Sequence, residues 1–156
     1  MEKFLGITKD GREVFDRSHS HLHYEEGLTE ELLFEGISMI DSTELREKDG
    51  CFVINMGREI GYSSCVPTTD KDEIVIVYRK NREGWTRMVK NRTGIPTSNL
   101  TVVIKEHNGY LRCLTAYVGS GAPKEPWDRS LKTNKERIES IKFWSKHALL
   151  YNDELL

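Results

Sequence analysis

The strongest constraint on the fold of this 156-residue chain is a hairpin signal in its C-terminal half. Two largely apolar stretches, Leu100–Glu106 and Tyr110–Val118, flank the dipeptide Asn108-Gly109. Asn-Gly is the pair most favoured in the tight turns of antiparallel hairpins, because both residues tolerate a positive φ. The sequence therefore predicts an antiparallel sheet on which the other elements must pack.

Weaker patterns predict further strands. Asp10-Gly11 lies between the short candidates Lys3–Thr8 and Arg12–Asp16, which predicts an N-terminal hairpin. Glu73–Arg79 contains four consecutive apolar residues, which suits a central strand covered on both faces. Two more candidates are Cys51–Met56 and Trp85–Lys90.

Capping residues and apolar spacing predict three helices. Thr29 can cap the first, which would bury Leu32, Leu33, Gly36 and Ile37. Asp41 with Glu44 predicts a second helix that ends at Gly50. Thr133 with Glu136 begins a terminal helix whose apolar stripe is Ile138, Ile141, Trp144 and Ala148.

This order of elements predicts one α+β domain over residues 1–156. We expect an antiparallel sheet of four to five strands, with the N-terminal hairpin, the helices and the C-terminal helix packed on it. No apolar run is long enough to span a bilayer, so we expect no membrane partner. The lack of a secretory signal and three widely spaced cysteines predict a cytoplasmic protein with reduced thiols.

Charge is distributed unevenly along the chain. Residues 25–49 contain nine acidic and two basic residues, whereas residues 79–92 contain six basic residues and one acidic residue. A basic hairpin is the footprint expected where a polyanion binds, although solvated hairpin tips also carry such charge. The candidate substrate-binding residues are Lys80, Arg82, Arg87, Lys90 and Arg92.

Three of the five histidines alternate along one segment, at His19, His21 and His23. In an extended chain, residues two apart face the same side. The run fits a zinc site, acid–base catalysis, or a solvated loop. His147, in the predicted terminal helix, is a possible second proton carrier, although a packing role is the simpler interpretation.

Hydroxyl groups also gather on the last predicted strand, where Thr115 and Tyr117 share one face. Cleavage of RNA requires a base for the 2′-hydroxyl, an acid for the leaving 5′-oxygen, and cations or hydroxyls for the phosphoryl oxygens. RNA supplies its own nucleophile, so this chemistry needs no metal or cofactor. Histidine, arginine, threonine and tyrosine together fit these roles.

The C-terminal half resembles the sheet of the barnase–EndoU–colicin–RelE (BECR) group of small toxin ribonucleases. The likeness is carried by Ile74–Arg79, Leu100–Ile104 and Gly109–Tyr117, which ends in Thr-Ala-Tyr. Within that group, the chain is most similar to the RNase A-like toxin module. It departs from that module by continuing 39 residues past Tyr117, through a tail that the module lacks.

The resemblance implies a metal-independent endoribonuclease without cofactors. An early histidine (His19, His21 or His23) would transfer protons, Arg79 would be the sheet cation, and Thr115 and Tyr117 the late hydroxyl pair. RNA would be the substrate, and an antitoxin or immunity protein a possible partner. Two other hypotheses remain open: a non-catalytic phage or mobile-element protein that binds a host macromolecule through the acidic segment, and a zinc hydrolase built on the histidine run.

Overall fold

The structure is a computed structural model that describes residues 2–24, 27–80 and 82–156, with the backbone alone for residues 17–21. The chain forms two compact units. Unit 1 comprises Met1–Tyr62 and Pro96–Gly121, and unit 2 comprises Ser63–Ile95 and Ala122–Leu156. The prediction of a single domain stays a prediction, because two compact units can fold either together or separately.

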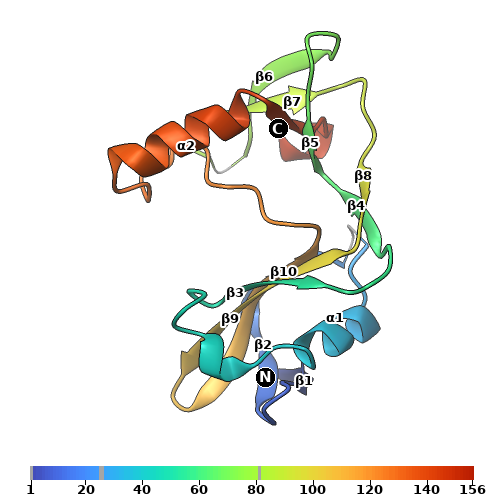
Figure 1. Cartoon of the computed structure of the whole chain (residues 1–156), viewed down its shortest axis with the longest axis vertical. Coiled ribbons are helices and arrows are strands. Elements are labelled where there is room, and N and C mark those ends of the chain that lie inside the picture. The colour runs from blue at the N-terminus through green and yellow to red at the C-terminus, as the bar shows by residue number, and fades with distance from the viewer. Residues whose placement is uncertain (1, 25–26, 81) are drawn as a thin grey trace. The chain divides into compact units, whose positions relative to one another are not determined.

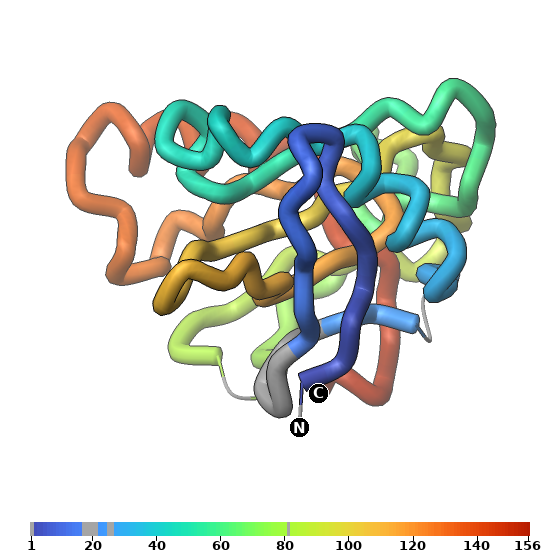
Figure 2. The backbone as a smooth tube through the Cα atoms, turned by 90° about the horizontal axis from the view of Figure 1, so that it is seen from below, coloured from blue at the N-terminus to red at the C-terminus, as the bar shows by residue number. Residues whose placement is uncertain are grey.

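Unit 1 is built on a five-stranded sheet (Figures 1 and 2). Its strand order is β1-β2-β10-β9-β3, and β2 and β10 run parallel whereas the other neighbours are antiparallel. The strands are β1 (Lys3–Ile7), β2 (Glu13–Leu22), β3 (Cys51–Asn55), β9 (Asn99–His107) and β10 (Tyr110–Val118).

Both predicted hairpins of unit 1 are confirmed. Asn108 and Gly109 have φ values of 52° and 82°, the positive angles that a tight turn between β9 and β10 requires. Gly11, with φ of 87°, lies in the turn between β1 and β2. At these two turns, the local sequence thus determines which strands pair.

One face of this sheet is covered by α1 (Glu30–Ile37), which packs against β1 and β9 (Figure 1). The Thr29 hydroxyl accepts a hydrogen bond from the Leu32 amide at 3.0 Å, as the predicted cap requires. The predicted buried residues of this helix are buried, and they join a core with the inward side chains of the strands. The second predicted helix is instead a single 3-10 turn, η2 (Ser42–Glu44).

Unit 2 contains a four-stranded sheet in the order β5-β11-β7-β6. A smaller core of Val66, Val89 and Ala148, with Ile74 and Leu150 packed against it, holds the strands together. Its elements are β5 (Cys65–Pro67), β6 (Ile74–Tyr78), β7 (Trp85–Val89), α2 (Asn134–Trp144), β11 (His147–Leu150) and the 3-10 turn η3 (Asp153–Leu155).

The α+β class is confirmed, but the prediction of one antiparallel sheet is wrong. The described residues form sheets of five, four and two strands, the last made of β4 (Gly61–Ser63) and β8 (Ile95–Thr97). The stretch Glu73–Arg79 forms β6 at the edge of its sheet, where Ile76 and Tyr78 are 51% and 72% exposed. Apolar residues on both faces of a strand therefore did not indicate a central position.

The C-terminal helix is shorter than predicted and does not bury the expected stripe. It ends at Trp144, and Ile138 and Ile141 are each about half exposed. Ala148 lies instead in β11, between β5 and β7, where it is fully buried. Among the described residues, no helix is long and apolar enough to cross a membrane.

Candidate active site

The face of the unit 1 sheet opposite α1 carries the hydroxyl pair predicted from the sequence. Strand register places Thr115 opposite Val103 and Tyr117 opposite Thr101. The neighbouring residues on these strands, such as Ala116 and Val102, point into the core with α1. A β-bulge between Cys113 and Thr115 shifts the alternation by one residue, so Cys113 points into the core whereas Thr115 points to the opposite face.

His23 lies beside this hydroxyl pair. Its backbone amide donates to the Ala116 carbonyl at 3.1 Å, which continues the pairing of β2 with β10. Its imidazole contacts the Tyr117 ring edge-on, with ring centroids 6.0 Å apart at an interplanar angle of 87°. The early histidine segment and the late hydroxyl strand, distant in sequence, are therefore neighbours in unit 1.

The Tyr117 hydroxyl lies in a confined position. Burial raises the pKa of Tyr117, and a hydrogen bond with Thr101 partly offsets that rise. A Cβ atom added at Gly121 would lie within 2.4 Å of the Tyr117 hydroxyl, so the glycine allows the chain to pass close to it. Thr101 is fully buried and donates to the Gly119 carbonyl at 2.7 Å. A neutral phenol held in this way can donate a hydrogen bond to an anionic oxygen.

Two cations that the sequence analysis missed share this face. The register places Arg112 opposite Lys105, in line with the positions of Thr115 and Tyr117. Arg112 forms an ion pair with Glu2 at 2.7 Å, and its buried Nε has no hydrogen-bond partner among the described residues. Simple alternation along Tyr110–Val118 would place Arg112 on the face opposite Thr115 and Tyr117. Only the bulge between Cys113 and Thr115 brings it to their face, so the sequence carried no signal for this cation.

The open face of β3, β9 and β10 therefore has a distinct charge. Its twelve positions include two cations, one histidine and no acidic residue, even though unit 1 as a whole is acidic. These positions are Cys51, Val53, Asn55, Asn99, Thr101, Val103, Lys105, His107, Tyr110, Arg112, Thr115 and Tyr117.

The other members of the histidine run cannot be placed in this way. The side chains of His19 and His21 lie outside the described part of the structure, although the backbone pairs His21 with Thr115. Among the side chains that are described, no three His, Cys, Asp or Glu groups come together as a metal site. The zinc hypothesis, which depends on His19 and His21, stays untested.

The predicted sheet cation, Arg79, lies in unit 2. Its Nη2 donates to Glu125 at 2.9 Å and its Nε donates to the Thr86 hydroxyl at 2.9 Å. Both charged side chains are largely buried, with 17% and 9% of their side-chain surface exposed. Arg79 therefore holds the segment around Glu125 against β7.

Two of the predicted substrate-binding arginines also have structural partners in unit 2. Arg87 donates from Nη1 to the Thr68 hydroxyl and to the Trp144 and His147 carbonyls, at 2.9, 3.3 and 3.0 Å. Arg92 pairs with Asp72 at 3.2 Å. The remaining predicted cations, Lys80, Arg82 and Lys90, are exposed, and Lys90 also lies 4.8 Å from the centroid of the Tyr151 ring.

His147 has a packing role in unit 2. Its ring stacks on Phe143 with centroids 3.9 Å apart, and its Nδ1 lies 2.9 Å from the Phe143 carbonyl oxygen. A carbonyl can only accept, so this nitrogen carries the hydrogen. The arrangement joins the end of α2 to the start of β11.

Part of the acidic segment's charge is neutralised within unit 1. Ion pairs connect Lys3 with Glu30, Arg58 with Glu35 at 2.7 Å, and Lys48 with Glu44 at 3.6 Å. The Arg58 guanidinium holds the pKa of Glu35 below its ordinary value.

Comparisons of this chain with protein-family models, with curated proteins and with solved structures found no match.

Proposed function

We propose that the chain is a metal-independent endoribonuclease of the BECR type that acts in the cytoplasm. The reaction would be attack of a 2′-hydroxyl on the adjacent phosphorus, with release of the 5′-oxygen. The observation that carries the proposal is the contact between His23 and Tyr117, on the strand that also presents Thr115. An imidazole beside two hydroxyl donors has the groups that proton transfer and charge stabilisation need.

In this proposal, His23 and three residues of the open face have distinct roles. His23 exchanges a proton with the 2′-hydroxyl or the leaving oxygen. Thr115 and Tyr117 donate to the phosphoryl oxygens, and Arg112 replaces Arg79 as the nearby cation. His19 and His21 remain candidates for the second proton carrier, since the reaction needs both a base and an acid.

The test is cleavage of a single-stranded RNA oligonucleotide in EDTA. We expect products with 2′,3′-cyclic phosphate ends, and no cleavage where the attacking 2′-hydroxyl is replaced by hydrogen. Since acid–base catalysis contributes about 100- to 10,000-fold, His23→Ala should lose at least about 100-fold in rate. The triple variant His19→Ala/His21→Ala/His23→Ala should be inactive.

His107 provides the matched control. It is an exposed histidine on the same face, but it lies at the turn end of β9, six residues beyond Thr101, so His107→Ala should cleave like the wild type. The proposal is refuted if the wild-type protein leaves every RNA intact, or if His23→Ala and His107→Ala cleave at the same rate.

An active enzyme of this type would degrade the RNA of its host. We therefore expect expression of the wild-type chain to slow growth and expression of His23→Ala to be tolerated. The partner that the proposal requires is an inhibitor protein, an antitoxin or immunity protein, that covers the open face of β3, β9 and β10.

A further inference from the structure

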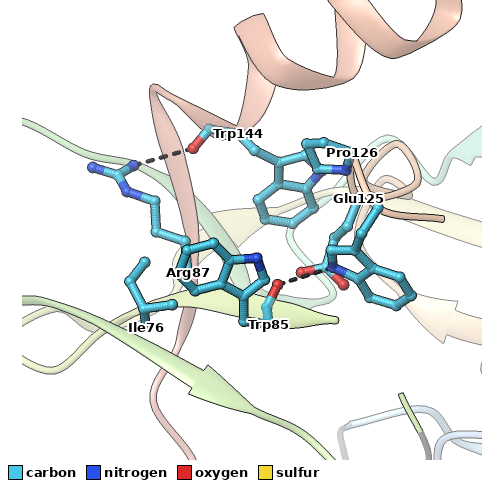
Figure 3. A pocket seen from close by; sticks show the side chains of 7 residues that line it. Ile76, Trp85, Arg87, Glu125, Pro126 and Trp144 are labelled. Atoms are coloured by element: carbon cyan, nitrogen blue, oxygen red, sulfur yellow. Dashed lines mark hydrogen bonds between the residues drawn. The ribbon is translucent and has the colours of Figure 1, made fainter. Parts of the chain in front are cut away.

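Unit 2 contains an apolar pocket walled by tryptophan (Figure 3). All three tryptophans of the chain, Trp85, Trp127 and Trp144, line it. Its volume of about 440 Å³ falls within the range of about 300–1,000 Å³ typical of small-molecule sites. The other lining residues are Ile76, Arg87, Glu125 and Pro126.

The aromatic walls are held in place by the backbone. The Trp127 indole donates from Nε1 to the Trp85 carbonyl at 2.9 Å, and the Trp144 indole donates to the Pro123 carbonyl at 3.2 Å. A Cβ atom added at Gly84 would lie 2.2 Å from the Trp127 ring, so only glycine allows this ring to lie against the turn. The pocket is therefore formed before any ligand binds.

The outer wall of the pocket faces solvent. Trp85 is 58% exposed, whereas Trp144 is only 7% exposed and forms the inner wall. The register places Tyr78, which is 72% exposed, directly opposite Trp85 on the neighbouring strand. Exposed aromatic rings on adjacent strands form a surface on which flat rings can stack.

The charges around the pocket favour an anionic ligand. Fourteen basic and ten acidic residues give unit 2 a formal charge of +4, whereas nine and fifteen give unit 1 a charge of −6. The turn of the β6–β7 hairpin, which leads into Trp85, carries the exposed cations Lys80 and Arg82, whereas Lys90 follows the opposite end of β7.

The same charges disfavour a cationic ligand. An aromatic cage for a methylated ammonium needs an uncompensated acid or a neutral wall. Here Glu125 is paired with Arg79, and Arg87 adds a positive charge to the wall.

We propose that this pocket binds a base of single-stranded RNA by stacking on tryptophan, with the flanking phosphates held by the hairpin cations. The inference names a substrate-binding site in unit 2 for the proposed ribonuclease. It depends on residues of unit 2 alone, so it is tested separately from cleavage.

Binding can be followed by the intrinsic fluorescence of the chain, because every tryptophan lies in the pocket. The probes are the four nucleoside 5′-monophosphates and an eight-nucleotide single-stranded RNA whose 2′-hydroxyls are methylated, so that it cannot be cleaved. Free N-acetyltryptophanamide is the control for light absorbed by the probes. We expect saturable quenching by both kinds of probe and tighter binding of the oligonucleotide. Binding of the oligonucleotide should weaken in high salt more steeply than binding of the monophosphates, because more phosphates are contacted.

Substitutions measured by calorimetry then locate the site. Trp85→Leu should weaken binding by about 10- to 100-fold and Trp85→Phe by much less, because a stacking ring remains. Tyr62→Leu is the matched control, since Tyr62 is a 65% exposed aromatic residue of unit 1 that lies outside the five-stranded sheet. Gly84→Ala should displace Trp127 and weaken binding. If Gly84→Ala unfolds the protein, the exposed substitution Trp85→Leu alone tests the inference.

Three results would overturn the inference: no saturable binding of any nucleotide probe, unchanged binding by Trp85→Leu, or preferential binding of tetramethylammonium. The variant His23→Ala should bind the oligonucleotide like the wild type. If the wild-type protein binds the oligonucleotide but cleaves no RNA, the nuclease proposal is refuted and the tryptophan pocket stays supported. If RNA is cleaved but Trp85→Leu does not change binding, the nuclease proposal is supported and the tryptophan pocket is refuted.

Discussion

The buried ion pair between Arg79 and Glu125 gives the sharpest stability prediction. Removing one partner of a fully buried pair costs about 3–5 kcal/mol, because the other charge is left without compensation. Arg79 keeps its bond to Thr86 and is 17% exposed, so water can reach it in part. We therefore expect Glu125→Leu to lower the free energy of unfolding of unit 2 by about 2–3 kcal/mol.

The double variant Arg79→Met/Glu125→Leu measures the interaction free energy between the two residues apart from the effect of each single substitution. Two well-packed apolar groups often replace a buried pair at little cost, so the double variant should lose about 1–2 kcal/mol less than the sum of the single variants. Urea unfolding followed by tryptophan fluorescence is the assay, since all three tryptophans report on unit 2.

An exposed ion pair of the same unit serves as the control. Arg129 and Glu83 are 2.9 Å apart, with 86% and 59% of their side-chain surface exposed. Arg129→Met should change the free energy of unfolding by less than about 0.5 kcal/mol. Our reasoning would be wrong if Glu125→Leu were as stable as this control, or if the effects of the double variant were additive.

Three further predictions concern unit 1. Thr29→Ala removes the cap of α1 and should cost about 1 kcal/mol, measured by circular dichroism during urea unfolding. Although burial alone would raise the pKa of Asp10, hydrogen bonds from Ser42 lower it from 3.8 to about 2. The lowered pKa of Asp10 contributes stability above about pH 4, and this contribution is lost as the pH falls towards 2. Asp10→Asn should therefore make the free energy of unfolding depend less on pH in this range. The change should be less than about 1 kcal/mol because Asp10 is exposed. Burial raises the pKa of Cys113 to about 12, so an alkylating reagent should modify the exposed Cys51 in the folded protein and reach Cys113 only after unfolding, as peptide mapping would show. Early modification of Cys113 would contradict the buried position of β10.

The sequence predicts those features of the fold that depend on neighbouring residues. The Thr29 cap and the two hairpin turns each depend on a few consecutive residues, and all three are confirmed. The terminal helix also begins as predicted, with Thr133 accepting from the Glu136 amide at 3.1 Å.

Features that depend on distant contacts were harder to predict. Ala148 fits a helical stripe, but it becomes part of a strand because Val66, far earlier in the chain, supplies its partner. The position of β6 at a sheet edge likewise depends on strands that pair elsewhere.

In the candidate site too, features that depend on neighbouring residues were predictable and those that depend on distant contacts were not. The pairing of Thr115 with Tyr117 on one face follows from strand alternation, and the nearness of His23 depends on the parallel pairing of β2 with β10. Charge alone could not show that Arg79 is held by Glu125, which lies 46 positions away. Counting cations along a hairpin therefore overestimates how many are available to a ligand.

The parallel pairing of β2 with β10 has a consequence for synthesis on the ribosome. β10 lies between β2 and β9 in the sheet, yet the chain makes β3 and the first half of unit 2 before it makes β10. The β1–β2 hairpin must therefore wait with one edge unpaired, and contacts between such distant segments slow folding. During that interval the nascent chain exposes a strand edge that a chaperone could protect and that another chain could capture.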